Sequence, residues 1–385
     1  MREIEAIIAA FTKAQKNELE CVLATVVHVE GSSYRKAGAR MLIDENGMMT
    51  GAISGGCLEG DAMRKALHSL HQGKNKLITY DTSDEEDAII GAQLGCNGII
   101  QVLFEPIDQE NESNPIELLR KVVAHKQPLV IVTLFNLDKS LEQTGTSMVI
   151  DQQLKSIFYT ETEKYIDPIK RDARLIFEQQ HNYFSIYKND GKDIYAFLEY
   201  YLPPVKLVLI GAGNDAQVLA SMADVLGWEI AVVDGRPTHA NTTRFVSACQ
   251  VVVSKPETLL ENISIDERTV FVLISHNYNY DLAVLKILLQ YPEIPYIGIL
   301  GPKKKYQRMF IDLNAEGISL SAGQEEKIFA PIGLHLGAET PAEIALSVLA
   351  EIQMVLTGAN GASLRTIKGS IHGKKFDDFI VSTIE

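Results

Sequence analysis

A glycine loop in the second half of the chain, set between two apolar runs, restricts the possible folds more than any other stretch. Residues 205–210 are almost wholly apolar, G-x-G-x-x-A follows from Gly211 to Ala216, and an amphipathic segment leads to a second apolar run that ends in Asp234. The first glycine of such a loop makes a tight turn, the second admits a pyrophosphate to the helix N-terminus, and the small third residue lets helix and strand pack. The pattern predicts a Rossmann-like fold with a doubly wound parallel sheet.

Whether this loop holds a dinucleotide is a separate matter. Gly211, Gly213 and Asp234 are the candidate NAD(P)-binding residues, and Arg236 leaves NAD and NADP undecided, because an arginine near the acid accommodates a 2′-phosphate. His276 follows a later apolar run, at the carboxyl edge of the sheet where open α/β folds bind ligands. It is a candidate catalytic residue, with a helix-capping loop residue as the alternative.

A second glycine-rich stretch reads Ser-Gly-Gly-Cys-Leu-Glu from Ser54 to Glu59, just before residues 61–72, which have helical periodicity. Glycine is used where φ must be positive or where a group must approach the backbone closely. The positive end of a helix dipole favours the thiolate form of a cysteine, so Cys57 is a candidate reactive thiol. A tight turn around a small buried cysteine is the alternative. Cys96 is also bracketed by glycines.

Residues 31–40 form a polar, glycine-containing loop with three cations, Arg35, Lys36 and Arg40. Such a cluster indicates an anion site, and a solvated basic loop fits the pattern equally well.

Composition excludes several classes of protein. The 36 basic and 50 acidic residues give a formal charge of −14, which argues against nucleic acid or an anionic membrane as a partner. Four cysteines without a C-x-x-C pair predict neither a zinc site nor a disulfide framework. The chain has no apolar signal core near its start and no apolar run near the ~18 residues of a membrane span. We expect a reduced, cytoplasmic protein.

The pattern of elements predicts an α/β protein of two domains. Residues 1–202 are expected to form an α+β domain with a mixed or antiparallel sheet, in which 1–107 carries the motifs and 108–202 carries none. A Leu-Pro-Pro segment marks the boundary, and residues 203–385 are expected to form the Rossmann-like domain. In the first domain we expect helices at 3–16, 61–72, 115–125 and 167–180, strands at 20–29, 76–81, 99–104 and 129–134, and a hairpin at 41–53.

Together these segments resemble the XdhC/CoxI family, the maturation factors of xanthine and carbon monoxide dehydrogenases. The resemblance covers about residues 1–107 and 203–356 and departs from the family pattern at Tyr34, Asn277 and His335. It includes Gly31-Ser32-Ser33, Gly38-Ala39-Arg40-Met41, the Ser54–Glu59 motif, Gly95-Cys96-Asn97-Gly98, Gly211-Ala212-Gly213, Val233-Asp234, Arg236-Pro237, Ser275-His276, residues 298–301 and residues 333–351.

The resemblance implies a chaperone without turnover of its own. Such a protein binds molybdenum cofactor, shields it while a partner cysteine desulfurase installs the sulfido ligand, and hands it to an apo molybdenum hydroxylase; a homodimer is expected. Cys57 is then a possible molybdenum ligand or sulfur carrier, with Cys96 as its neighbour. The anionic tail of the cofactor suits two sets of residues: the N-terminal set Arg35, Lys36, Arg40, Ser54, Gly55 and Gly56, or the Rossmann set Gly211, Gly213, Asp234 and Arg236. The alternative is an NAD(P)-dependent oxidoreductase with His276 as proton donor.

Overall fold

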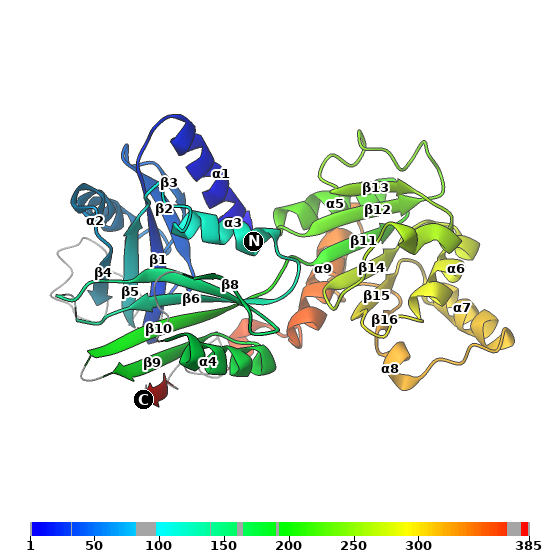
Figure 1. Ribbon diagram of the computed structural model, residues 1–385. Coiled ribbons are helices and arrows are strands. Elements are labelled where there is room, and N and C mark those ends of the chain that lie inside the picture. The colour runs from blue at the N-terminus through cyan, green and yellow to red at the C-terminus, as the bar shows by residue number, and fades with distance from the viewer. Residues whose placement is uncertain are drawn as a thin grey trace. The chain divides into compact units, whose positions relative to one another are not determined.

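The computed structural model describes residues 2–31, 33–81, 98–138, 140–159, 165–189, 192–367 and 379–383. The chain divides into two units, Met1–Pro203 with Lys368–Glu385, and Pro204–Ile367 (Figure 1). The boundary at Pro203 lies in the Leu-Pro-Pro segment. At the other end the structure differs from the expected division, because the last described strand, β17 (Phe379–Thr383), pairs with a strand of the first unit.

The first unit contains two sheets. One has the order β3-β2-β1-β5-β4 and is antiparallel throughout. Its strands are β1 (Cys21–Gly31), β2 (Arg40–Asp44), β3 (Met49–Gly51), β4 (Lys76–Asp81) and β5 (Gly98–Pro106). The other has the order β17-β9-β10-β6-β7-β8 and is antiparallel except for the β17–β9 pair. Its remaining strands are β6 (Leu129–Phe135), β7 (Gly145–Asp151), β8 (Ser156–Tyr159), β9 (Tyr183–Asn189) and β10 (Lys192–Tyr201).

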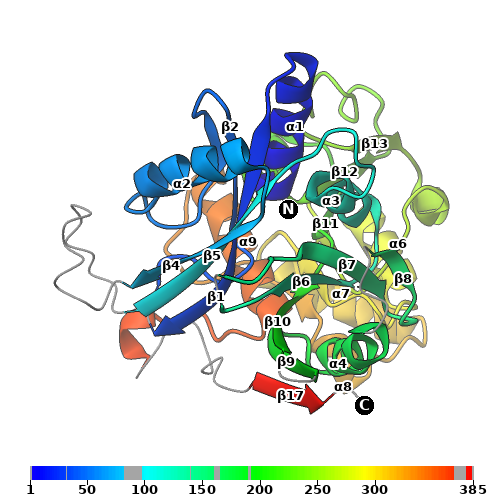
Figure 2. The same ribbon diagram turned by 60° about the vertical axis from the view of Figure 1, so that its left-hand side comes forward.

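These two sheets pack face to face, with a helix on each outer face (Figure 2). Aromatic side chains of the second sheet, including Phe184 and Phe197, contact Val27 and Leu103 of the first. Helix α2 (Glu59–Gln72) covers the outer face of the first sheet, and α4 (Ile166–Gln179) covers that of the second. Alternate residues of each central strand therefore face a helix and the opposite sheet, which is why these strands are buried on both faces.

Helices α1 (Arg2–Lys16) and α3 (Pro115–Ala124) complete the core of the first unit. The apolar face of α1 is buried, with Ile7 and Phe11 fully inaccessible. Pro115 begins α3 directly after Asn114, whose side chain accepts hydrogen bonds from two backbone N–H groups of the first turn. The start of α3 thus follows ordinary capping chemistry.

A buried polar belt, defined as Arg40, Glu105, Thr146 and Glu199, crosses the interface between the two sheets. Arg40 of β2 is 2% exposed, and its Nη2 donates to Glu199 Oε2 of β10 at 2.6 Å. Glu105 of β5 accepts hydrogen bonds from the backbone N–H and the hydroxyl of Thr146 in β7. Burial raises the pKa of the Glu105 carboxyl, against the opposing effect of Thr146 and Arg40. The belt joins the sheets through charge and hydrogen bonds.

The second unit is a Rossmann-like domain, as predicted. Its sheet has the order β13-β12-β11-β14-β15-β16, and every pair is parallel. The strands are β11 (Lys206–Ile210), β12 (Glu229–Asp234), β13 (Gln250–Val253), β14 (Thr269–Leu273), β15 (Tyr296–Ile299) and β16 (Ile328–Phe329). This order reverses direction between β11 and β14, which is where open α/β sheets bind ligands.

Helices cover both faces of this sheet (Figure 1). Helices α5 (Asn214–Val225) and α9 (Pro341–Thr357) pack on one face, and α6 (Tyr278–Leu288) and α7 (Lys303–Ala315) pack on the other, beside the 3-10 turn η3 (Pro256–Glu261). Two short elements, α8 (Ala322–Glu325) and the 3-10 turn η4 (Leu364–Thr366), lie nearer the end of the unit. Thr340 and Glu343 form a capping box at the start of α9.

We predict that Arg40→Met destabilises the first unit. The substitution leaves the Glu199 carboxylate without its cation, and breaking a buried ion pair costs about 3–5 kcal/mol. Urea unfolding followed by circular dichroism measures the effect. The control is Arg64→Met, because Arg64 is 68% exposed and pairs with Asp61 at the surface, where a pair contributes about 1 kcal/mol or less. Equal losses in the two variants would contradict the role given to Arg40.

Candidate functional site

The Ser-Gly-Gly-Cys-Leu-Glu segment connects β3 to α2 and is closed by a clasp between its two ends. The backbone N–H of Ser54 donates to Glu59 Oε1 at 2.9 Å, and the Ser54 hydroxyl donates to Glu59 Oε2. The same hydroxyl oxygen accepts hydrogen bonds from the N–H groups of Gly56 and Leu58, at 3.2 and 3.1 Å. The serine and the glutamate of the motif therefore fix the path of the four residues between them.

The clasp also changes the acidity of Glu59. Burial of the carboxyl favours its neutral form, but hydrogen bonds from Ser54 and from backbone N–H groups hold its pKa below the usual value. Glu59 is thus an ionised acceptor at neutral pH, and its charge is directed at Ser54.

Cys57 lies two residues before the first residue of α2 and is half-buried. Its thiol donates to the Ser54 oxygen, with an Sγ–Oγ distance of 3.5 Å. Gly56 has φ of +106°, and no atom lies within 4 Å of the position that a Cβ would take, so backbone conformation rather than crowding requires glycine there. Next to it, a Cβ on Gly55 would lie 3.2 Å from the ring of Tyr34. The turn is therefore open at Gly56 and lies against an aromatic ring at Gly55, while Cys57 itself packs partly against the core between the first sheet and α2.

The structure does not gather the three predicted cations into one site. Arg40 belongs to the buried polar belt, where Glu199 balances its charge, so its assignment as a ligand-binding residue is corrected. Arg35 is partly exposed and pairs with Glu3 of α1, at 2.6 Å between Nη2 and Oε1. Lys36 is exposed. The physical reason is that each arginine makes charge-assisted hydrogen bonds to a carboxylate of a neighbouring element, Glu199 or Glu3.

Cys96, expected beside Cys57, lies outside the residues that the structure describes. The described residues contain no group of three or more His, Cys, Asp and Glu side chains arranged to hold a metal ion. Within the same residues, no helix is both long and apolar enough to cross a membrane.

In the second unit the loops after β11 and β14 meet at the point where the strand order reverses. Gly211 has φ of +122°, and a Cβ there would lie 2.5 Å from the backbone of Ile274 and Ser275. His276, itself at φ of +58°, places its ring 3.7 Å from the Cβ position of Gly213, and its Nε2 lies 3.5 Å from Asp215 Oδ2. The structure thus brings the predicted residues Gly211, Gly213 and His276 together.

Asp234 is placed differently from the expectation of a free ribose-binding acid. Its carboxylate accepts hydrogen bonds from the N–H of Ala212 at 2.8 Å and from three donors of Arg236, the backbone N, Nε and Nη2, at 2.7–2.9 Å. Burial of the carboxyl opposes ionisation, but these bonds hold the pKa of Asp234 below its usual value. Asp234 and Arg236 bind each other, and their assignment as cofactor-binding residues stays a prediction.

Comparison with known proteins identifies the family. The XdhC Rossmann domain matches residues 207–352, and the XdhC and CoxI family matches residues 14–81. A Bacillus subtilis (strain 168) protein, whose name describes a probable subunit of xanthine dehydrogenase, is 31% identical over 341 residues, which are 88% of this chain and 93% of that protein. The chain belongs to the XdhC and CoxI family.

Two further proteins are similar over most of their length. The molybdenum cofactor insertion chaperone PaoD of Escherichia coli (strain K12) is 25% identical over 87% of this chain and 83% of its own. A crystal structure described as a xanthine dehydrogenase from Bacillus halodurans superimposes with a TM-score of 0.71 at 26% identity, over 93% of this chain and 98% of its own. The fold of the XdhC/CoxI chain therefore extends through residues 108–202, which carry no motif.

Sequence reasoning missed two residues that hold the loops of this XdhC/CoxI protein. Arg244 donates from Nη1 to the carbonyl of Ala212 at 2.7 Å and from Nη2 to the side chains of Asn214 and Gln217 at 3.0 Å. An isolated arginine in a long loop gives no signal of this role. Glu59 was part of a recognised motif, and its fixed spacing from Ser54 was the signal that could have assigned it to the clasp.

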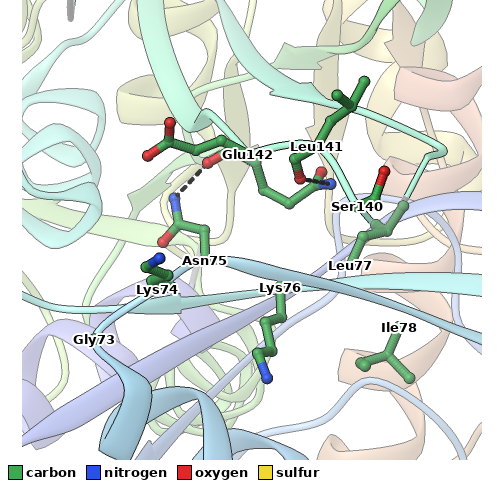
Figure 3. A pocket seen from close by; sticks show the side chains of 10 residues that line it. Gly73, Lys74, Asn75, Lys76, Leu77, Ile78, Ser140, Leu141 and Glu142 are labelled. Carbon is green, nitrogen blue, oxygen red and sulfur yellow. Dashed lines mark hydrogen bonds between the residues drawn. The ribbon is translucent and has the colours of Figure 1, made fainter.

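A groove of roughly 640 Å³ lies elsewhere in the first unit, between the start of β4 and the loop before β7 (Figure 3). Asn75 bridges its two walls by donating to the carbonyls of Gln143 and Thr144 at 3.2 and 3.1 Å. Lys74 and Lys76 line one wall, and Glu142 lies on the other. The described residues that line this groove include none of the site residues predicted from the sequence.

The clasp predicts a pH-dependent contribution to stability. Because the folded pKa of Glu59 is depressed, its contribution is present above the ordinary glutamate pKa of about 4.3 and is lost as pH falls through the folded value. The difference in unfolding free energy between wild type and Glu59→Gln should therefore be larger at pH 7 than at pH 3. Glu110→Gln, at an exposed site, is the control and should show no such trend. A difference independent of pH would contradict the clasp.

A second prediction concerns the glycine loop of the second unit. Gly211→Ala combines an unfavourable φ with a clash against Ile274, so we expect a loss of roughly 2–4 kcal/mol in unfolding free energy. Fluorescence of Trp228 reports this unit, because Trp228 is the single tryptophan of the chain and packs in its core. Gly323→Ala is the matched control, since no atom lies within 4 Å of its Cβ position. A Gly211→Ala protein as stable as the control would exclude close packing of the two loops.

Proposed function

We propose that this protein is a maturation factor that binds molybdenum cofactor, protects it during sulfuration and delivers it to a molybdenum hydroxylase of the xanthine dehydrogenase or carbon monoxide dehydrogenase type. The observation that carries the proposal is the Ser54–Glu59 clasp, which presents the thiol of Cys57 on an open glycine turn. Membership of the XdhC and CoxI family and similarity to a molybdenum cofactor insertion chaperone support it.

The chemistry of the turn suits this cargo. A thiolate is a soft ligand for molybdenum and a competent carrier of sulfur. The empty space at Gly56 lets a large group approach the backbone, and Tyr34 offers an aromatic face beside it, on which a flat pterin ring would stack. Lys36, exposed in the neighbouring loop, is available to the phosphate of the cofactor. Ser54 and Glu59 hold the turn in place.

The partners follow from the same role. We propose an apo molybdenum hydroxylase as the recipient, a cysteine desulfurase as the source of sulfur, a homodimer as the working form, and the cytoplasm as the location. The Bacillus subtilis relative, named for xanthine dehydrogenase, supports a client of that type. Its name also suggests a different relationship, a permanent subunit of the hydroxylase, which differs from a chaperone in one measurable way: a chaperone leaves its client after delivery.

Cofactor content tests the proposal directly. The full chain is purified from a host that makes molybdenum cofactor, and metal analysis is combined with fluorescence detection of the oxidised pterin. We expect molybdenum and pterin in the wild type and a content at least about tenfold lower in Cys57→Ala, because loss of the thiol weakens binding. Cys249→Ala is the control, because Cys249 is an exposed thiol of the second unit. Wild-type protein without molybdenum and pterin would overturn the proposal.

Delivery is tested separately. An apo-hydroxylase is incubated with the loaded protein, and hydroxylase activity and complex formation are followed by assay and gel filtration. We expect activity to appear while the two proteins elute apart at the end. A stable complex that persists in the active hydroxylase would identify a permanent component of that enzyme, and normal maturation by Cys57→Ala would remove the thiol from the mechanism.

A further inference from the structure

In the second unit, other groups of the protein cover Asp234, the carboxylate at the position that binds ribose in a dinucleotide site. In a Rossmann domain the acid at the end of the second strand binds the ribose hydroxyls of the adenosine half. Here Asp234 is only 5% exposed at its side chain, and Arg236 and the N–H of Ala212 supply four hydrogen bonds to its two oxygens. A ribose diol would have to displace a charged partner to reach it, and charge-assisted pairs of this kind are the stronger ones.

Tyr280 fills the space beside that carboxylate. Its ring lies 3.4 Å from the Cβ position of Gly235, the residue after Asp234, and its hydroxyl donates to the carbonyl of Ser254 at 2.7 Å. The side chain therefore runs from the start of α6 across the end of β12 to the residue that follows β13. Because a nucleoside joins its base directly to the ribose, an adenine attached to a ribose at Asp234 would need this same region.

We propose that Arg236 and Tyr280 are specificity-determining residues that close the adenosine side of the Rossmann crevice against NAD and NADP. Arg236 occupies the ribose acceptor, and Tyr280 occupies the adjoining region between the ends of β12 and β13. The part of the crevice left to a ligand is then the loop of Gly211 and Gly213 beside His276, which suits a phosphate that carries no adenosine.

The orientation of Arg236 distinguishes exclusion of both nicotinamide cofactors from selection of NADP. Its side chain is 48% exposed, so it is placed to meet a ligand, yet its Nε and one of its Nη donors are directed back to Asp234. An arginine that bound the 2′-phosphate of NADP would instead direct its fork outward. The bidentate pair therefore favours exclusion of both nicotinamide cofactors over selection of one.

The test uses the full chain and two ligands. NADH and NADPH are titrated by isothermal calorimetry and by their own fluorescence, against wild type, Arg236→Ser, Tyr280→Ala and the double variant. For the wild type we expect a dissociation constant above about 1 mM for both NADH and NADPH. We expect the double variant to bind NADH at least about tenfold more tightly than the wild type. Arg308→Ser, on the exposed face of α7, is the control and should behave as the wild type.

Either of two results overturns the inference. One is wild-type binding of NADH or NADPH with a dissociation constant below about 1 mM. The other is a double variant that stays folded, with wild-type Trp228 fluorescence, and gains no affinity for NADH. The first result needs no variant, so the proposal stays testable if the variants do not fold. Molybdenum and pterin content of the same proteins separates this inference from the proposed function, because Arg236→Ser and Tyr280→Ala should retain the cofactor.

Discussion

The buried ion pair between Arg40 and Glu199 is the interaction on which the arrangement of the first unit depends. It joins β2 of one sheet to β10 of the other, and its arginine also bonds to the carbonyl of Gly38, at the end of the polar loop. A Cβ at Gly38 would lie 2.9 Å from the Glu199 carboxylate, so this loop lies against the second sheet as closely as glycine allows. The buried charge pair therefore fixes the end of this loop at Gly38, four residues after Tyr34.

The same pattern recurs at two other cations of the motifs. Arg35 pairs with Glu3, and Arg236 pairs with Asp234. With 50 acidic and 36 basic residues, most cations of this chain can find a carboxylate, and these three do so at points where loops must be held. In both candidate sites, ion pairs within the protein hold the loops that surround the site. The groups that remain for a ligand are a thiol and glycine turn in the first unit and, as a separate site, a glycine loop beside His276 in the second.

The second unit combines a familiar glycine loop with an acid that bonds inside the protein. The glycine loop of the second unit keeps the turn and the close packing of a dinucleotide fold, since Gly211 contacts the backbone after β14. Its acid, however, has become an internal acceptor, and Arg244 braces the loop through the carbonyl of Ala212. The fold persists because packing and backbone conformation require it, whereas the ligand depends on a few side chains at its edge.

Local patterns in the chain were sufficient for the elements and for much of the fold. The stripe of α1, the capping box of α9, the strand–loop–helix–strand of the Rossmann domain and the Ser54–Glu59 turn each lie within a short stretch, where side-chain periodicity and turn chemistry act directly. Contacts between residues far apart in the chain could not be predicted from such local patterns. Arg40 and Glu199 are 159 residues apart, Tyr280 and Ser254 are 26 apart, and the C-terminal strand returns to β9 of the first unit. These contacts depend on strand order and register, which place distant side chains against one another, and they determine which motif residues face a ligand and which bind each other.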